Sequence, residues 1–217
     1  MKHYKAICFD FDYTLGDCTD SIVAGFQNGF AKLGWPEPDR ETVRGTIGFL
    51  LEDSYTMLTK DEDEERRGLF RKYFIEVAME RQRRETTLFP YAPELLRGLK
   101  EAGIGAGIVS TKRGDTIKII LENHGLRDCF GVVIGSADVQ KHKPDPQGLF
   151  LAMERLGVQK EEVLFCGDTV LDAGAAKNAG CDFAAVLNGT TPAEAFEGYP
   201  CVHISPDLED LARWLGL

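Results

Sequence analysis

The stretch AICFDFDYTL, residues 6–15, decides the fold of this chain. It is a short apolar run without alternation, which is typical of a parallel strand covered by helices on both faces. The run ends in Asp10 and Asp12, and residues two apart on a strand point to the same side. Open α/β sheets bind ligands at the carboxyl ends of their strands. Two acids there need a cation or a proton to neutralise them, and the hard, oxygen-preferring cation that fits best is Mg²⁺.

From residue 88 onward, helical patterns and apolar runs alternate. Four predicted helices end at a glycine, which favours the left-handed C-terminal cap, and a β-branched or aromatic run follows each one. This alternation predicts a mostly parallel sheet with right-handed crossovers. The predicted helices cover residues 93–102, 115–124, 146–156, 172–179 and 208–215, and the later strands cover 105–110, 130–135, 163–167, 183–187 and 202–204.

Residues 16–87 lack any strong strand pattern. Ile22, Phe26 and Phe30 recur at helical spacing, and a long amphipathic helix begins after the acidic run 61–65. We therefore expect an α/β core with a doubly wound, mostly parallel sheet, built from residues 1–15 and 88–217. An all-helical cap domain is inserted at 16–87, where it can exclude water from the strand ends.

Composition narrows the possible partners of this 217-residue chain. Its net charge of −10 argues against a nucleic-acid or anionic-membrane surface. No apolar stretch is long enough to cross a membrane, and the first strand begins without a signal peptide, so we expect a cytoplasmic protein. The six cysteines and four histidines are scattered, which predicts reduced, buried thiols and no zinc site. We expect a monomer or a weak homodimer.

Polar residues follow four of the predicted strands. If the topology is right, they converge on one edge of the sheet. The set contains several acids, a hydroxyl and a lysine, which suits a phosphoryl group held between Mg²⁺ and an ammonium group. The four motifs are Asp10-x-Asp12-x-Thr14, Ser110-Thr111-Lys112, Lys141-His142-Lys143-Pro144-Asp145 and Gly167-Asp168-Thr169-x-x-Asp172.

These four motifs, in this order across residues 10–172, resemble those of the haloacid dehalogenase superfamily of phosphohydrolases. The likeness is to the subgroup with a helical cap after the first strand, and within it to phosphoglycolate phosphatase-like proteins. The resemblance implies a Rossmann-like core. It also implies an Mg²⁺-dependent phosphatase that hydrolyses a small phosphorylated metabolite through an aspartyl-phosphate intermediate.

The resemblance also implies catalytic roles. Asp10 would be the nucleophile that attacks phosphorus, and alignment and charge neutralisation would offset the weakness of a carboxylate as a nucleophile. Asp12 would be the general acid for the leaving oxygen and then the base that activates water. Ser110, Thr111 and Lys143 would bind the phosphoryl group, with Lys143 also neutralising Asp10.

For the metal, the resemblance implies Asp10, the backbone carbonyl of Asp12, and Asp168 as ligands. Asp172 would be a further ligand or a group that orients the others. Simpler interpretations exist for some of these residues. Asp168 and Asp172 could be a helix cap and a first-turn acid favoured by the helix dipole. Ser110 could be the N-cap of the helix that follows it, in addition to binding phosphate.

One position departs from the family pattern. Tyr13 stands where the family usually has a glycine, so we expect Gly16 to absorb the tight turn instead. We hypothesise that the Tyr13 ring faces the cap and narrows the site, and an unchanged substrate profile in Tyr13→Gly would contradict this. Lys112, Lys141 and His142 are interpreted as structural or peripheral.

Other activities remain open on the sequence. An inorganic pyrophosphatase or a sugar phosphomutase would use the same chemistry, and residues 46–51 resemble cap segments of both phosphoglycolate phosphatases and related pyrophosphatases. A dehalogenase would need no metal and no acid at position 12, so Asp12 argues against this alternative. A phospho-accepting receiver would carry its phosphorylated aspartate directly after the third strand and has no large helical insertion. The nearest acid after that strand is Asp138, which does not follow it directly, so the receiver alternative is disfavoured. A catalytically silent binding protein is disfavoured by the complete set of acids.

Overall fold

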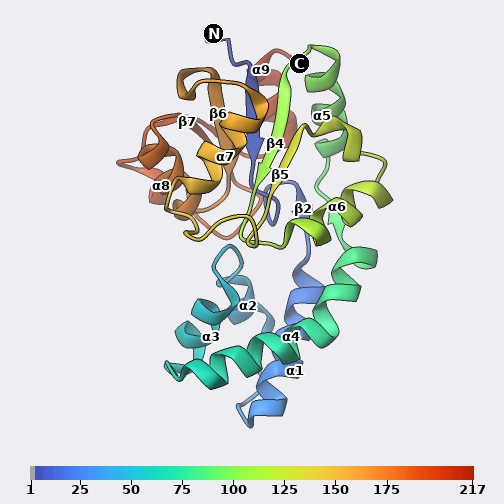
Figure 1. Cartoon of the computed structure of the whole chain (residues 1–217), viewed down its shortest axis with the longest axis vertical. Helices are drawn as coiled ribbons and strands as arrows, with labels where there is room; N and C mark the ends of the chain where they lie inside the picture. Colours follow the sequence, from blue (N-terminus) through green and yellow to red (C-terminus); the bar gives the residue numbers. More distant parts are fainter. Residues whose placement is uncertain (1–2) are drawn as a thin grey trace. The chain divides into compact units, whose positions relative to one another are not determined.

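Strand β1 (Ala6–Phe9) lies inside a six-stranded sheet with the order β5-β4-β1-β6-β7-β8 (Figure 1). The computed structural model describes residues 3–217. β1 pairs in parallel with β4 (Gly105–Val109) on one side and with β6 (Val163–Gly167) on the other. The outer strands, also parallel to their neighbours, are β5 (Val132–Ile134), β7 (Asp182–Val186) and β8 (Cys201–Ser205). All four side chains of β1 are buried, as its apolar run predicts.

Helices cover both faces of this sheet (Figure 1). Ala6 and Cys8 of β1 belong to an apolar cluster with residues of α7 and α8. Because side chains alternate along a strand, Ile7 and Phe9 point to the opposite face, and both are buried. The helices of this unit are α5 (Ala92–Glu101), α6 (Gly114–Asn123), α7 (Gln147–Leu156), α8 (Val170–Ala179) and α9 (Leu208–Leu215), with 3₁₀ turns η1 (Arg127–Cys129), η2 (Lys160–Glu162) and η3 (Ala193–Phe196). The predicted doubly wound α/β fold is confirmed.

The helix ends explain why the sequence pattern was informative. Four glycines that follow helices have a positive φ, between 66° and 75°, and so adopt the left-handed conformation that ends a helix. They are Gly103, Gly125, Gly157 and Gly180. The bounds of β6 and α9 match the predicted ranges, and the other strands and helices after residue 88 differ by one or two residues at an end.

Residues 17–87 form a separate helical unit with α1 (Thr19–Leu33), α2 (Arg40–Arg44), α3 (Leu51–Thr59) and α4 (Glu64–Glu85). The other compact unit combines the chain up to Gly16 with Leu88–Leu217. Two short strands that the sequence analysis did not predict, β2 (Gly16–Asp17) and β3 (Thr87–Leu88), pair where the chain passes between the units.

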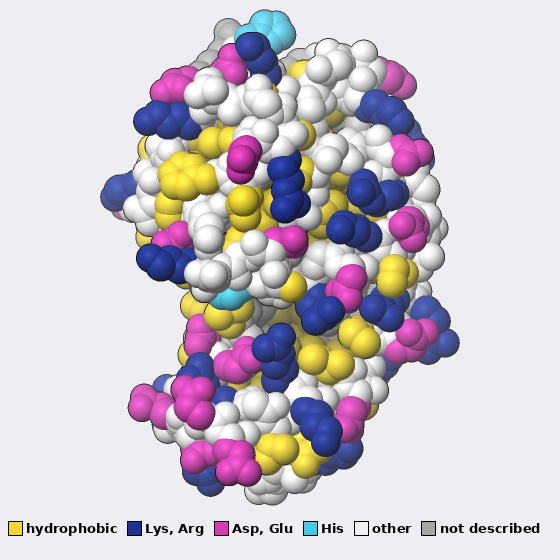
Figure 2. Space-filling model, in the orientation of Figure 1, with side chains coloured by type: hydrophobic (Ala, Val, Ile, Leu, Met, Phe, Trp, Pro, Cys, Tyr) yellow, Lys and Arg dark blue, Asp and Glu magenta, His cyan; other side chains and the backbone are white. Residues whose placement is uncertain are grey.

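The membrane-spanning potential, the cysteines and the surface charge can be compared with what composition predicts. Within residues 3–217, no helix is both long enough and apolar enough to cross a membrane. Cys8, Cys18, Cys166 and Cys181 are buried, as expected of small apolar side chains. On the face seen in Figure 2, side chains of both charges are interspersed.

Candidate active site

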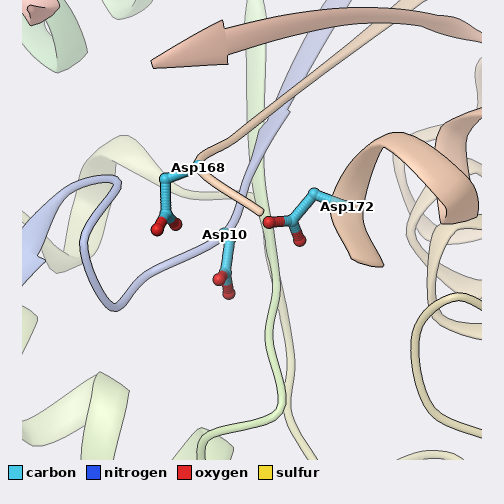
Figure 3. Close-up of side chains that lie close together, drawn as sticks. All are labelled: Asp10, Asp168 and Asp172. Atoms are coloured by element: carbon cyan, nitrogen blue, oxygen red, sulfur yellow. The ribbon is translucent and has the colours of Figure 1, made fainter. Parts of the chain in front are cut away.

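Three buried aspartates meet at the carboxyl edge of the sheet. Asp10 follows β1, Asp168 follows β6, and Asp172 lies in the first turn of α8 (Figure 3). One carboxylate oxygen from each lies within 4.8 Å of the others. The residues are 1%, 3% and 0% exposed, respectively. Adjacent parallel strands end at the same edge, which is why residues 158 positions apart in the chain come together here.

Lys143 joins two of these acids. Its Nζ lies 3.0 Å from Oδ1 of Asp10 and 2.6 Å from Oδ1 of Asp172. Burial lowers the pKa of this ammonium group, but the two carboxylates raise it, and the pKa ends above its ordinary value. Lys143 is therefore a fixed positive charge in the cluster.

A second lysine holds the other acid of the first motif. Nζ of Lys112 lies 2.9 Å from Oδ2 of Asp12, and the two side chains are only 6% and 12% exposed. Lys112 is therefore not peripheral, because it makes a buried ion pair with an acid of the site, which agrees with the structural half of its interpretation. The second oxygen of Asp12, Oδ1, is buried and has no hydrogen-bond partner within residues 3–217.

Asp172 is also part of the start of helix α8. Its Oδ2 accepts hydrogen bonds from the backbone N and the Oγ1 of Thr169, at 3.0 Å and 2.6 Å. Thr169 is the N-cap, so the pair forms a reciprocal capping box. The cap interpretation of Asp168 is therefore wrong, and the interpretation of Asp172 as a first-turn acid is confirmed. Both Asp172 oxygens already have donors, from Lys143 and Thr169.

The hydroxyl motif lies directly after β4. Ser110 is buried, and its Oγ accepts a hydrogen bond from the backbone N of Lys112 at 3.3 Å. Helix α6 begins later, with Arg113 as its N-cap, so the N-cap interpretation of Ser110 is wrong. Ser110 and Thr111 line the same hollow as Lys143. Lys141 and His142 line it too.

The charges of the cluster favour one divalent cation. Burial raises the pKa of Asp10 to about 6, Lys143 opposes this rise, and Asp172 adds to it. Burial and the charges of Asp172 and Asp10 likewise raise the pKa of Asp168 well above its usual range. When ionised, the four aspartates and two lysines sum to a formal charge of −2.

The oxygens support the same conclusion. Oδ2 of Asp10 is buried and has no hydrogen-bond partner within residues 3–217. Buried, unsatisfied carboxylate oxygens are costly unless a proton or a cation meets them. An all-oxygen donor set of this kind suits Mg²⁺, so the residues present fit the metal.

The loop that carries Asp12 is tight. The backbone N of Leu15 and of Gly16 both donate to the carbonyl of Phe11, at 2.9 Å and 3.0 Å. Tyr13 has φ 60°, the left-handed region that a large side chain rarely adopts. The expectation that Gly16 absorbs the turn was wrong, because Tyr13 takes the unusual conformation itself. Its buried ring lies 6.5 Å from that of Phe89, centroid to centroid.

Two polar contacts near Asp168 were missed by the sequence analysis. The hydroxyl of Thr14 donates to Oδ1 of Asp168 at 3.0 Å. The side-chain amide of Asn188 donates to the carbonyl of Thr14 at 3.2 Å. Asn188 and Gly189 follow β7, so the rule that examined the end of each strand could have found them.

Comparisons with known proteins agree on one family. A family model described as "Haloacid dehalogenase-like hydrolase" matches residues 7–186. A protein of Salmonella typhimurium named phosphoglycolate phosphatase is 32% identical over 242 residues, covering 100% of this chain and 94% of that protein. A solved structure from Bacteroides fragilis, with the same haloacid dehalogenase-like hydrolase description, is 40% identical with a TM-score of 0.92. It covers 96% of this chain and 99% of that one.

Proposed function

Because this chain is a phosphatase that belongs to the haloacid dehalogenase-like hydrolase family, we propose that it hydrolyses small phosphorylated metabolites of the phosphoglycolate type. The reaction uses Mg²⁺ and passes through an aspartyl-phosphate on Asp10. The observation that carries the proposal is the buried cluster of Asp10, Asp168, Asp172 and Lys143 at the strand ends.

Asp10 is the nucleophile in this proposal. A carboxylate oxygen of Asp10 attacks phosphorus, and the bond from phosphorus to the leaving oxygen breaks. The position of Asp10 is fixed by the buried end of β1 and by Lys143, 3.0 Å from Oδ1. A weak nucleophile benefits most from such alignment, because the cost of orienting it is met before the reaction. Lys143 also offsets charge on the phosphoryl oxygens.

Asp12 moves the proton. Its Oδ2 is held by Lys112, whereas Oδ1 has no hydrogen-bond partner within residues 3–217. This free oxygen supports a role for Oδ1 as the atom that gives a proton to the leaving oxygen. In the second half of the reaction, Asp12 takes a proton from water, which attacks phosphorus and releases phosphate and free Asp10.

The metal would be held by Asp10, the backbone carbonyl of Asp12, and Asp168. When bound, Mg²⁺ supplies positive charge that neutralises the phosphoryl oxygens and the attacking carboxylate. We propose that Asp172 acts beside the metal and not as a ligand. Its two oxygens are engaged by Lys143 and Thr169, which supports a role in orienting Lys143.

Ser110 and Thr111 bind the phosphoryl group in this proposal, because they directly follow β4, which pairs in parallel with β1 and so ends beside Asp10. We further propose that the helical unit Asp17–Thr87 is the cap domain. Its insertion in the chain directly after the Asp12 loop supports this role. Such a domain would exclude water and contact the leaving group.

The proposal is tested by phosphate release from a panel of phosphorylated metabolites that includes phosphoglycolate and pyrophosphate. Each compound is assayed with Mg²⁺ and with EDTA, beside Asp10→Asn. We expect metal-dependent turnover of a phosphate monoester that is lost in Asp10→Asn. Turnover of pyrophosphate alone would favour a pyrophosphatase, and conversion of a sugar phosphate without phosphate release would favour a phosphomutase. Equal turnover in EDTA would contradict the metal role.

A further inference from the structure

The turn after β7 lies against the carboxylate of Asp168. A Cβ atom placed on Gly189 would lie 2.2 Å from Oδ2 of Asp168 and 3.0 Å from its Cγ. Real Cβ atoms do not approach other heavy atoms within 3.0 Å. Gly189 is therefore required to be a glycine for space, because any side chain there would displace the carboxylate.

The same turn reaches Asp168 by a second route. Asn188 donates from its side-chain amide to the carbonyl of Thr14 at 3.2 Å. The hydroxyl of Thr14 donates to Oδ1 of Asp168 at 3.0 Å. Thr14 and Asp168 are both buried. One oxygen of Asp168 is thus hydrogen-bonded through the loop after β1, and the other is bounded by Gly189.

We infer that Asn188 and Gly189 form a positioning element that sets the orientation of the Asp168 carboxylate for the metal. The inference rests on the proposed function, in which Asp168 is a metal ligand. Groups that orient a metal ligand contribute strongly to metal binding, and losing one typically lowers metal affinity roughly 10–100-fold. Asn188 and Gly189 lie outside the four strand-end motifs, so they add the end of β7 to the site.

The contact predicts where a substitution acts. The atoms that meet a Cβ on Gly189 belong to the side chain of Asp168 and not to the backbone. The carboxylate can rotate away without moving the sheet, so Gly189→Ala should misplace the ligand and leave the fold intact. Asn188→Ala removes one hydrogen bond and introduces no clash, so its effect should be smaller.

The test measures metal binding directly on the full chain. Mg²⁺ is titrated by calorimetry, Mn²⁺ binding is followed by electron paramagnetic resonance, and melting is recorded in EDTA. We expect Gly189→Ala to raise the Kd for the metal by about 10-fold or more. Asn188→Ala and Thr14→Val should raise it less, and their double variant should show less than the product of the two effects, because both act on one carboxylate. Gly68→Ala is the matched control, since a Cβ there meets nothing within 4 Å.

Each outcome decides the inference. Weaker metal binding with an EDTA melting temperature close to that of the wild type supports it. Unchanged Kd values in Asn188→Ala and Gly189→Ala, while the wild type binds Mg²⁺ and releases phosphate, overturn the inference alone. A lowered EDTA melting temperature with unchanged metal binding assigns the turn to the fold and also overturns it. A wild type that binds neither cation overturns the proposed function and this inference together.

Discussion

The strand-end site and the interior of the helical unit bury side chains in opposite ways. Between α1 and α4, aromatic rings pack with centroids 5.1 Å apart for Phe26 and Phe70 and 5.7 Å apart for Phe26 and Phe74. The polar group beside them is satisfied, because the Tyr55 hydroxyl donates to Asp61 at 2.7 Å and accepts from Trp35 at 3.0 Å.

At the strand ends, by contrast, four acids and two lysines are buried together. Oδ2 of Asp10 and Oδ1 of Asp12 lack hydrogen-bond partners within residues 3–217, and burial raises the pKa of Asp10 to about 6. The helical interior is arranged for stability, whereas the site gives up stability to hold charges where a phosphoryl group and a cation can meet them. Substitutions in the site should therefore lower activity more than stability, and substitutions in the helical interior should mainly lower stability.

The largest expected effect is in the site. Asp10→Asn should lower kcat by at least about 10⁴-fold, which corresponds to about 5.5 kcal/mol of barrier. Its free energy of unfolding in EDTA should not fall, because the change removes one charge from a crowded set of acids. Phosphate release and urea denaturation measure the two quantities. A clear loss of stability in Asp10→Asn would contradict the view that the site, unlike the helical interior, gives up stability.

The next effect is expected in the helical unit. Phe70 is fully buried, and Phe70→Ala should lower the free energy of unfolding by about 3–5 kcal/mol through lost packing and a cavity. Urea denaturation measures it, with Lys72→Ala as the exposed control on the same helix. A loss below about 1 kcal/mol would show that this interior tolerates a void, and the contrast with the site would weaken.

Removing Lys112 tests the role of Asp12 as the proton donor. In Lys112→Met, the Asp12 carboxylate loses the ammonium group that holds its Oδ2 at 2.9 Å, so Oδ1 is no longer held in position to give a proton to the leaving oxygen. We expect kcat/KM for an alkyl phosphate to fall roughly 10–100-fold, within the range of general acid catalysis. p-Nitrophenyl phosphate, whose more acidic leaving group depends far less on protonation, should lose much less. The exposed Lys118→Met on α6 is the control, and equal losses on both substrates would assign Lys112 another role.

The last expected effect, the net of two opposing terms, concerns Tyr13. Tyr13→Gly relieves the left-handed backbone at φ 60°, which is worth about 1–2 kcal/mol. It also removes a buried ring, which costs about 3–5 kcal/mol. The net result should therefore be a free energy of unfolding lower by about 2 kcal/mol than that of the wild type, as measured by urea denaturation. A variant more stable than the wild type would show that backbone strain outweighs the packing of this ring against Phe89. Its substrate profile separately tests whether the ring narrows the site.

Local rules predicted much of the fold. The apolar run of β1, its two acids, and glycines such as Gly157 and Gly180 are local signals, because burial and helix caps depend on nearby residues. The short strands β2 and β3 could not be predicted, since two residues carry too little pattern. The φ of Tyr13 was missed because the closing hydrogen bonds of its loop, and not the residue type, determine it.

Contacts between distant motifs were harder to predict. Each motif of the candidate site is visible in the sequence, but the pairing of Lys112 with Asp12 joins residues 100 positions apart. No spacing rule distinguishes that lysine from Lys141, which lies in a neighbouring motif. The space around Gly189 is likewise a property of the folded turn, because a glycine after a strand usually serves only the turn itself.

The most direct test of the account asks whether Asp10 carries the phosphoryl group. Asp12→Ala is mixed rapidly with an aryl phosphate and Mg²⁺, so that the first step proceeds without an acid and the second lacks its base. The account predicts a burst of about one equivalent of phenol per enzyme. Acid-quenched peptide mapping should then find the phosphoryl group on Asp10, with neither signal in an Asp10→Asn, Asp12→Ala double variant. A phosphoryl group on another residue, or steady turnover without any burst, would contradict the central claim.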